Sequence, residues 1–137
     1  MKQEVNPQES IRADAFNMWM SSPVPMVTLV KTLDVTRLVK VSKRTGMKFT
    51  MLMCWCIGRA ASNVVEEFFL LPENGRLFRF DRLAINIVVQ NVKGGICLCD
   101  VPFSDDIEQF NANYLVHFQI LSYLCINYIS NTSLIHL

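Results

Sequence analysis

The sequence is poor in histidine, and this scarcity limits the chemistry that it can perform. Its two histidines, His117 and His136, both lie near the end of the 137 residues. The chain also lacks a Gly-rich phosphate-binding loop, the H-E-x-x-H pattern of zinc proteases and the G-x-S-x-G pattern of α/β-hydrolases. The residue patterns by themselves therefore assign no catalytic residue.

The chain also lacks an excess of either charge. Thirteen basic and twelve acidic residues leave a net charge of +1, and charged residues make up 18% of the sequence. Proteins that bind nucleic acids or anionic membranes usually carry a basic patch, so we expect neither partner. The basic residues between Lys40 and Lys48 are interpreted as the solvated face and end of a helix.

The N-terminus lacks an apolar signal core, and the five cysteines are an odd number without a secretory pattern. We therefore expect a cytoplasmic protein with free thiols. Cys54 with Cys56 and Cys97 with Cys99 form two C-x-C pairs, but zinc sites generally use wider spacings. Because buried cysteines commonly act as small hydrophobes, we expect no metal site.

Apolar periodicity and turn residues predict a series of helices and strands. Helices are expected from Asn6 to Ser22, from Asp34 to Gly46, over residues 50–65, and after Ser104, which should cap the start of the last one. Strands are expected over residues 26–33, 76–80, 83–92 and 96–101, with turns at residues 72–75 and 94–95. Phe110 and Tyr114 should face inward from the last helix. This order indicates an α/β or α+β layer structure.

The end of the chain differs from the rest, because every charged residue lies before Gln109. A transmembrane anchor needs about 20 mostly apolar residues, and Gln119, Ser122 and Asn127 interrupt the run. A buried element at an oligomer interface is a second explanation. We favour a third, loss of the reading frame near Leu115, because the segment has no periodicity and contains neither Gly nor Pro. We therefore treat residues 116–137 as an anomalous uncharged tail, separate from residues 1–115.

Several segments, taken together, carry a resemblance to a known family. They are Arg12–Trp19, Leu33–Thr36, Lys48–Thr50, Leu77–Asp81 and Pro102–Tyr114. The last resembles the Pro-(Tyr/Phe)-Ser-x-Asp-(Ile/Leu)-x-x-Phe-x-x-x-Tyr motif of chloramphenicol acetyltransferases, and the others resemble further segments of that family in order and spacing. The resemblance implies an α/β fold, a two-layer mixed-sheet sandwich of the chloramphenicol acetyltransferase type. It also implies that this fold is truncated, with residues 1–115 as its N-terminal part.

The family mechanism depends on a residue that this chain lacks. The resemblance implies a homotrimer. It also implies that a histidine of a His-His-x-x-x-Asp-Gly motif acts as the general base. That histidine removes a proton from the acceptor hydroxyl, which then attacks acetyl-CoA. This sequence contains neither a His-His nor an Asp-Gly pair. The resemblance thus implies acetyl transfer to a small hydroxylated acceptor, but we expect this chain alone to be inactive and to bind no acetyl-CoA.

Three positions match family residues near the acceptor site. Trp19 matches an aromatic residue that lines the acceptor pocket, and an aromatic core residue is the alternative interpretation. Met18 is also near the pocket in the family, although we favour a core position for it. Arg12 matches an arginine that pairs with the motif's aspartate, so without this aspartate we expect a solvated or misplaced side chain.

Two other functions remain open. The chain could be a non-catalytic oligomerisation or interaction module, in which the apolar tail forms an interface. It could also be a related acyltransferase core, as in the dihydrolipoyl acyltransferases, which share the histidine motif. The aromatic residue at position 19 favours the chloramphenicol acetyltransferase resemblance over this second possibility.

Overall fold

The chain folds into helices packed around two small sheets. The computed structural model describes residues 2–10, 12–24, 26, 28–63, 69–90, 92, 94–124 and 135–136. The elements in chain order are β1 (Lys2–Val5), the 3₁₀ helix η1 (Pro7–Glu9), α1 (Ala13–Ser21), α2 (Thr36–Thr45), α3 (Phe49–Asn63), β2 (Leu70–Glu73), β3 (Arg76–Phe80), β4 (Leu83–Gln90), β5 (Ile96–Pro102), α4 (Ile107–Leu124) and β6 (Ile135–His136).

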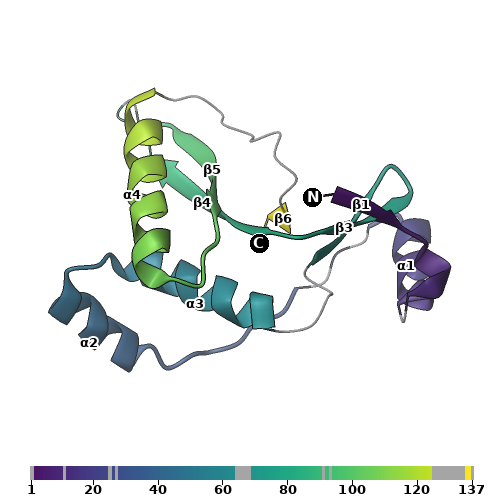
Figure 1. Ribbon diagram of the computed structural model, residues 1–137, viewed down its shortest axis with the longest axis horizontal. Coiled ribbons are helices and arrows are strands. Elements are labelled where there is room, and N and C mark those ends of the chain that lie inside the picture. The colour runs from purple at the N-terminus through teal and green to yellow at the C-terminus, as the bar shows by residue number, and fades with distance from the viewer. Residues whose placement is uncertain are drawn as a thin grey trace.

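The two sheets have three strands each, in the orders β1-β3-β2 and β5-β4-β6. Pairing is antiparallel throughout, apart from the parallel pair of β4 with β6. The β4–β5 hairpin lies with α3 and α4 toward one end of the molecule, and β1, β3 and α1 lie toward the other (Figure 1). The result is a mixed helix and strand fold in which most strands are antiparallel.

The β4–β5 hairpin forms as its sequence predicts, and it provides one face of the main core. Gly94 adopts a φ of 83° in the connection, a conformation that glycine reaches at little cost. Successive residues of a strand point to opposite faces, so β4 buries every second side chain from Ile85 to Gln90. The main core combines this face with residues of α3 and α4: Met51, Leu52, Ile85, Ile87, Val89, Cys99, Val101, Phe110 and Tyr114.

The burial of the described cysteines depends on the strand or helix that carries them. Cys97 and Cys99 are buried and share the core face of β5, whereas Cys54 is half-buried and Cys56 exposed on α3. Burial raises the pKa of Cys99 to about 11, and the neighbouring Asp100 adds to the effect. Among the described residues, no cluster of three or more His, Cys, Asp or Glu side chains could hold a metal.

Capping residues define both ends of α2 and the start of α4. At α4 the capping residue differs from the predicted one. The Asp34 side chain accepts a hydrogen bond from the Thr36 N–H at 2.9 Å, and hydrogen bonds from Thr36 lower the pKa of Asp34. Gly46, with a φ of 75°, ends α2 as expected. Asp106 accepts from the Glu108 N–H at 2.9 Å at the start of α4, so Asp106 takes the capping role predicted for Ser104.

The prediction of one continuous helix from Asn6 to Ser22 is wrong. The Asn6 side chain caps only the short 3₁₀ helix, by accepting from the Gln8 N–H at 3.1 Å. Ser10 then adopts an extended conformation with ψ of 144°, and its hydroxyl accepts from the Arg12 N–H at 3.1 Å. Such a local side-chain bond competes with helical hydrogen bonding, so α1 begins afresh at Ala13.

The strand predicted over residues 26–33 is also wrong. Met26 and residues 28–33 have no regular structure, and Leu29 and Val30 are 90% and 92% exposed. Strand propensity largely reflects packing against neighbouring strands, and no described strand pairs with this segment. Conversely, β1 and β2 were not predicted, because both form by pairing with β3.

Helix α4 runs across the boundary between residues 115 and 116 that the sequence suggested. Phe118 packs against the main core, with its ring stacked on that of Tyr114 at a centroid distance of 6.0 Å. Lys48 places its Nζ 3.6 Å from the centre of the Phe118 ring. The tail residues 125–134 and 137 lie outside the described residues. Within the described part, no helix has the length and apolarity to cross a membrane.

Candidate functional site

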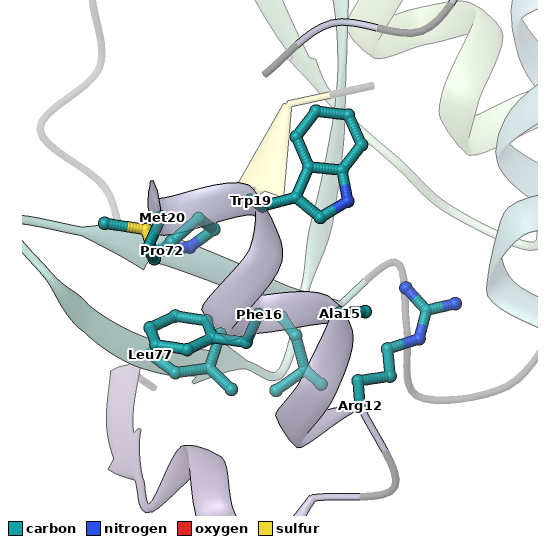
Figure 2. A pocket seen from close by; sticks show the side chains of 8 residues that line it. Arg12, Ala15, Phe16, Trp19, Met20, Pro72 and Leu77 are labelled. Atoms are coloured by element: carbon teal, nitrogen blue, oxygen red, sulfur yellow. The ribbon is translucent and has the colours of Figure 1, made fainter. Parts of the chain in front are cut away.

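A cavity of about 350 Å³ lies between α1 and the β2–β3 hairpin. Its lining residues come from three elements and the residue before α1: Arg12, Ala15, Phe16, Trp19, Met20, Leu70, Pro72 and Leu77. Figure 2 shows these side chains around α1, with Trp19 and Arg12 on one side of the helix and Met20 and Leu77 on the other. The cavity is therefore built where a helix meets a sheet.

Helix α1 and the residue before it supply one wall of the cavity, through residues at helical spacing. Arg12, Ala15 and Trp19 follow one another three and four residues apart, which places them along one face of a helix. Trp19 remains 37% exposed, so part of its indole is available to a ligand. The neighbouring Met18 does not line the cavity, and the core position that we favoured for it is wrong, because its side chain is 66% exposed. Of the three positions suggested by the resemblance, the structure brings Arg12 and Trp19 together and leaves Met18 out.

The β2–β3 hairpin supplies the opposite wall. Asn74 and Gly75 both have positive φ, 51° and 79°, which makes the tight turn that joins the two strands. The turn sets a register in which Pro72 pairs with Leu77. Leu77 is only 5% exposed, so it anchors the floor of the cavity. The sequence placed Leu77 in a strand and Pro72 in a turn, but it assigned neither residue to a cavity, because β2 was not predicted.

Arg12 is the charged member of the lining. It occupies the N-cap position of α1, and its side chain is exposed with an interaction partner of its own. The N-terminal end of a helix carries a partial positive charge, which adds to that of the guanidinium. Asp14 in the first turn is the nearest acid along the helix, but residues two apart on a helix do not face each other. The guanidinium of Arg12 and the start of α1 thus lie together at the edge of the cavity.

The cavity has the chemistry of a binding site rather than a complete catalytic one. Seven of its eight described lining residues are apolar, and none is an acid or a histidine that could transfer a proton at neutral pH. His117 lies on α4, at the other end of the molecule from α1 (Figure 1). Its Nδ1 is 2.7 Å from the Asn113 carbonyl oxygen, which can only accept, so Nδ1 carries the proton.

A second hollow lies beside the start of α4. It has a volume of about 390 Å³ and is lined by Thr45, Gly46, Met47, Lys48, Glu108, Asn111 and Leu115. Lys48 and Glu108 give it charges of both signs, and Lys48 already lies over the Phe118 ring. The apolar cavity beside α1 is the better candidate, because it presents aromatic surface together with a single charged group.

Comparison with known proteins supports the fold. No protein-family model and no curated protein matches the chain. A solved structure of a chloramphenicol acetyltransferase superimposes on 85% of this chain with a TM-score of 0.75 and 19% sequence identity. The matched region covers 55% of that enzyme, so this chain spans about half its length. At this identity the match concerns architecture: the chain has a fold similar to that of a chloramphenicol acetyltransferase.

Proposed function

We propose that this chain is the acceptor-binding part of a chloramphenicol-acetyltransferase-like acyltransferase. The activity would be transfer of an acetyl group from acetyl-CoA to a hydroxyl group of a small acceptor. The observation that carries the proposal is the cavity beside α1, where Arg12 and Trp19 lie together in a fold similar to that enzyme's. Acetyl-CoA enters as the donor substrate, and none of the described residues is assigned to it.

The proposal includes three finer features of the whole protein. These are a two-layer mixed-sheet sandwich, a homotrimeric assembly and a cytoplasmic location. The general base would be a histidine outside this chain, since the sequence has no His-His-x-x-x-Asp-Gly motif. On this view the chain is a truncated form that binds the acceptor without completing the reaction.

Acceptor binding by the cavity is the direct test. Chloramphenicol titrated into the full chain by calorimetry should bind, and Trp19→Ala should weaken binding about tenfold or more, which corresponds to ~1.4 kcal/mol. Met18→Ala is the matched control, because Met18 neighbours Trp19 but lies outside the cavity. Circular dichroism should show that both variants remain folded. Absence of binding, or equal binding by wild type and Trp19→Ala, would overturn the proposal.

A second function, an oligomerisation module, is favoured by the outer face of the β4–β5 hairpin. Val88 and Leu98 pair across the strands and are 64% and 52% exposed, and Ile96 beside them is 74% exposed. A contiguous apolar patch of this kind is typical of an interaction surface.

Sedimentation velocity, with variants of the hairpin face, tests this module. The wild type should then form an oligomer of defined size, and the double variant Val88→Lys with Leu98→Glu should be monomeric. Ile57→Lys is the control, since Ile57 is 50% exposed on α3, away from this hairpin face. A wild-type monomer would rule out the module.

A further inference from the structure

Helix α2 carries an uneven share of the charge of the chain. Residues 35–65 contain six of the thirteen basic residues and none of the twelve acidic ones. Four of the six, Arg37, Lys40, Lys43 and Arg44, lie on α2, and all four are exposed. The net charge of +1, from which we expected neither a nucleic acid nor an anionic membrane as partner, thus hides a local concentration of positive charge.

These four residues form one surface of the helix, the α2 basic face. Arg37, Lys40 and Lys43 follow one another at steps of three residues, and Arg44 follows Lys40 by four, so the side chains are neighbours on the helix surface. Leu38 packs against the main core from another side of α2. Among the described residues, none of the four cations forms an ion pair with an acid.

The needs of the helix account for only part of this pattern. The C-terminal end of a helix favours cations, which suits Lys43 and Arg44 in the last turn of α2. Arg37 lies in the first turn, where the helix dipole disfavours a positive charge. The basic face therefore matches an external anionic surface better than it matches the dipole of its own helix.

Exposed aliphatic side chains directly precede this face. Leu29 and Val30 are 90% and 92% exposed, and Leu33, three residues before the start of α2, is 63% exposed. The segment leads into α2, which lies at the outer edge of the molecule in Figure 1. Segments that bind at a bilayer surface combine these two features, cations that attract anionic headgroups and aliphatic side chains that enter the boundary of the acyl region.

We propose that the segment from Leu29 to Arg44 docks on a bilayer that contains anionic phospholipid. The α2 basic face contacts the headgroups, and Leu29, Val30 and Leu33 insert beside them. A nucleic acid would also attract the cations, but its phosphates offer no apolar surroundings for aliphatic side chains. A second copy of the chain would bring the same positive charges against one another.

Co-sedimentation of the full chain with vesicles tests this docking. At low ionic strength, the chain should bind vesicles of phosphatidylserine and phosphatidylcholine but not vesicles of phosphatidylcholine alone, and added salt should weaken the binding. The double variant Lys40→Gln with Arg44→Gln should bind about tenfold more weakly or worse, since each cation near an anionic bilayer is worth about fivefold in affinity. The control, Arg76→Gln with Arg82→Gln, removes as much charge from exposed positions outside α2 and should bind nearly as well as the wild type.

A second double variant tests the aliphatic side chains separately. Leu29→Ser with Val30→Ser should bind the anionic vesicles about tenfold more weakly, because it removes the apolar surface that enters the bilayer. All the substituted side chains are exposed, so circular dichroism should show that every variant remains folded.

Three outcomes would overturn the proposal. The first is equal binding of the wild type to neutral and anionic vesicles. The second is binding of either double variant, at Lys40 and Arg44 or at Leu29 and Val30, with the affinity of the wild type. The third is binding of polyuridylic acid as tight as that of the anionic vesicles and unaffected by the two serine substitutions, which would assign the basic face to nucleic acid instead.

Discussion

At Gly58 the backbone of α3 lies against the ring of Phe103. A methyl group added at Gly58 would lie 2.6 Å from Cε2 of Phe103 and 3.2 Å from Cδ1 of Ile85. Phe103 packs against both core clusters and lies 5.9 Å from the Phe110 ring, centroid to centroid. The absence of a side chain at Gly58 thus allows α3 to approach the hairpin.

We expect Gly58→Ala to lower the free energy of unfolding by up to about 2 kcal/mol. Overpacking a core costs roughly 1–3 kcal/mol, which exceeds the gain of about 1 kcal/mol from replacing a helical glycine. Urea denaturation followed by circular dichroism measures the change. The double variant Gly58→Ala with Phe103→Leu should recover part of the loss, because the smaller side chain makes room. A Gly58→Ala variant more stable than the wild type would contradict this packing.

The raised pKa of the Cys99 thiol predicts that the free energy of unfolding falls at alkaline pH. Its pKa is about 11 in the folded chain, because burial disfavours the thiolate, against about 9 for an ordinary thiol. The unfolded chain therefore loses this proton first, so the free energy of unfolding should fall as the pH rises from about 9 to about 11. Below pH 9 the thiol is neutral in both states and contributes no slope.

Other groups titrate in the same range, so the comparison is with Cys99→Ala. Urea unfolding at several pH values should give a steeper alkaline loss for the wild type than for this variant. Equal slopes would show that the Cys99 thiol ionises equally in both states.

At the scale of elements, α4 provides a test of the residues that follow Leu115. The Phe118 ring stacks on that of Tyr114, and the Tyr114 hydroxyl oxygen lies 3.1 Å from the Thr50 hydroxyl oxygen. Phe118→Ala should therefore lower stability by about 1–3 kcal/mol, below the cost of removing a fully buried Phe. Thermal unfolding of the full chain measures it, with Val116→Ala as control, since Val116 is 52% exposed on the same helix.

An unchanged stability of Phe118→Ala would support the division of the chain at residue 115. A loss confined to Phe118→Ala would mean instead that the helix continues to contribute to the fold beyond that point.

The elements that the sequence predicted are those with local signals. Helices α2 and α3, strand β3 and the β4–β5 hairpin have apolar periodicity bounded by turn or capping residues, and all were predicted within a few residues. Strands β1 and β2 depend on pairing with β3, which a local pattern does not encode. Arg12 and Trp19 were assigned to the acceptor site through a motif. Leu70, Pro72 and Leu77 were not assigned to it, because the wall that they form depends on the pairing of β2 with β3.

For the whole molecule, we predict no acetyl transfer by this chain alone. The cavity beside α1 has no described proton-transfer group, and losing a positioned general base costs about 10²–10⁴-fold in rate. A thiol-release assay with acetyl-CoA and chloramphenicol should therefore stay at background, with a full-length chloramphenicol acetyltransferase as positive control. Turnover by the purified chain that Arg12→Gln or Trp19→Ala reduces would contradict this prediction.

The pairing of β1 with β3 constrains the order in which the chain can assemble. Lys2 forms an ion pair with Glu73, 71 residues away in sequence, and its Nζ lies 4.1 Å from the centre of the Phe78 ring. Closing so long a loop costs more entropy than closing the short β4–β5 turn. During synthesis, β1 leaves the ribosome before β3 and must wait for β3 to emerge before it finds its partner. The sheet that forms the floor of the cavity is thus completed late, and β1 remains exposed to chaperones and proteases until then.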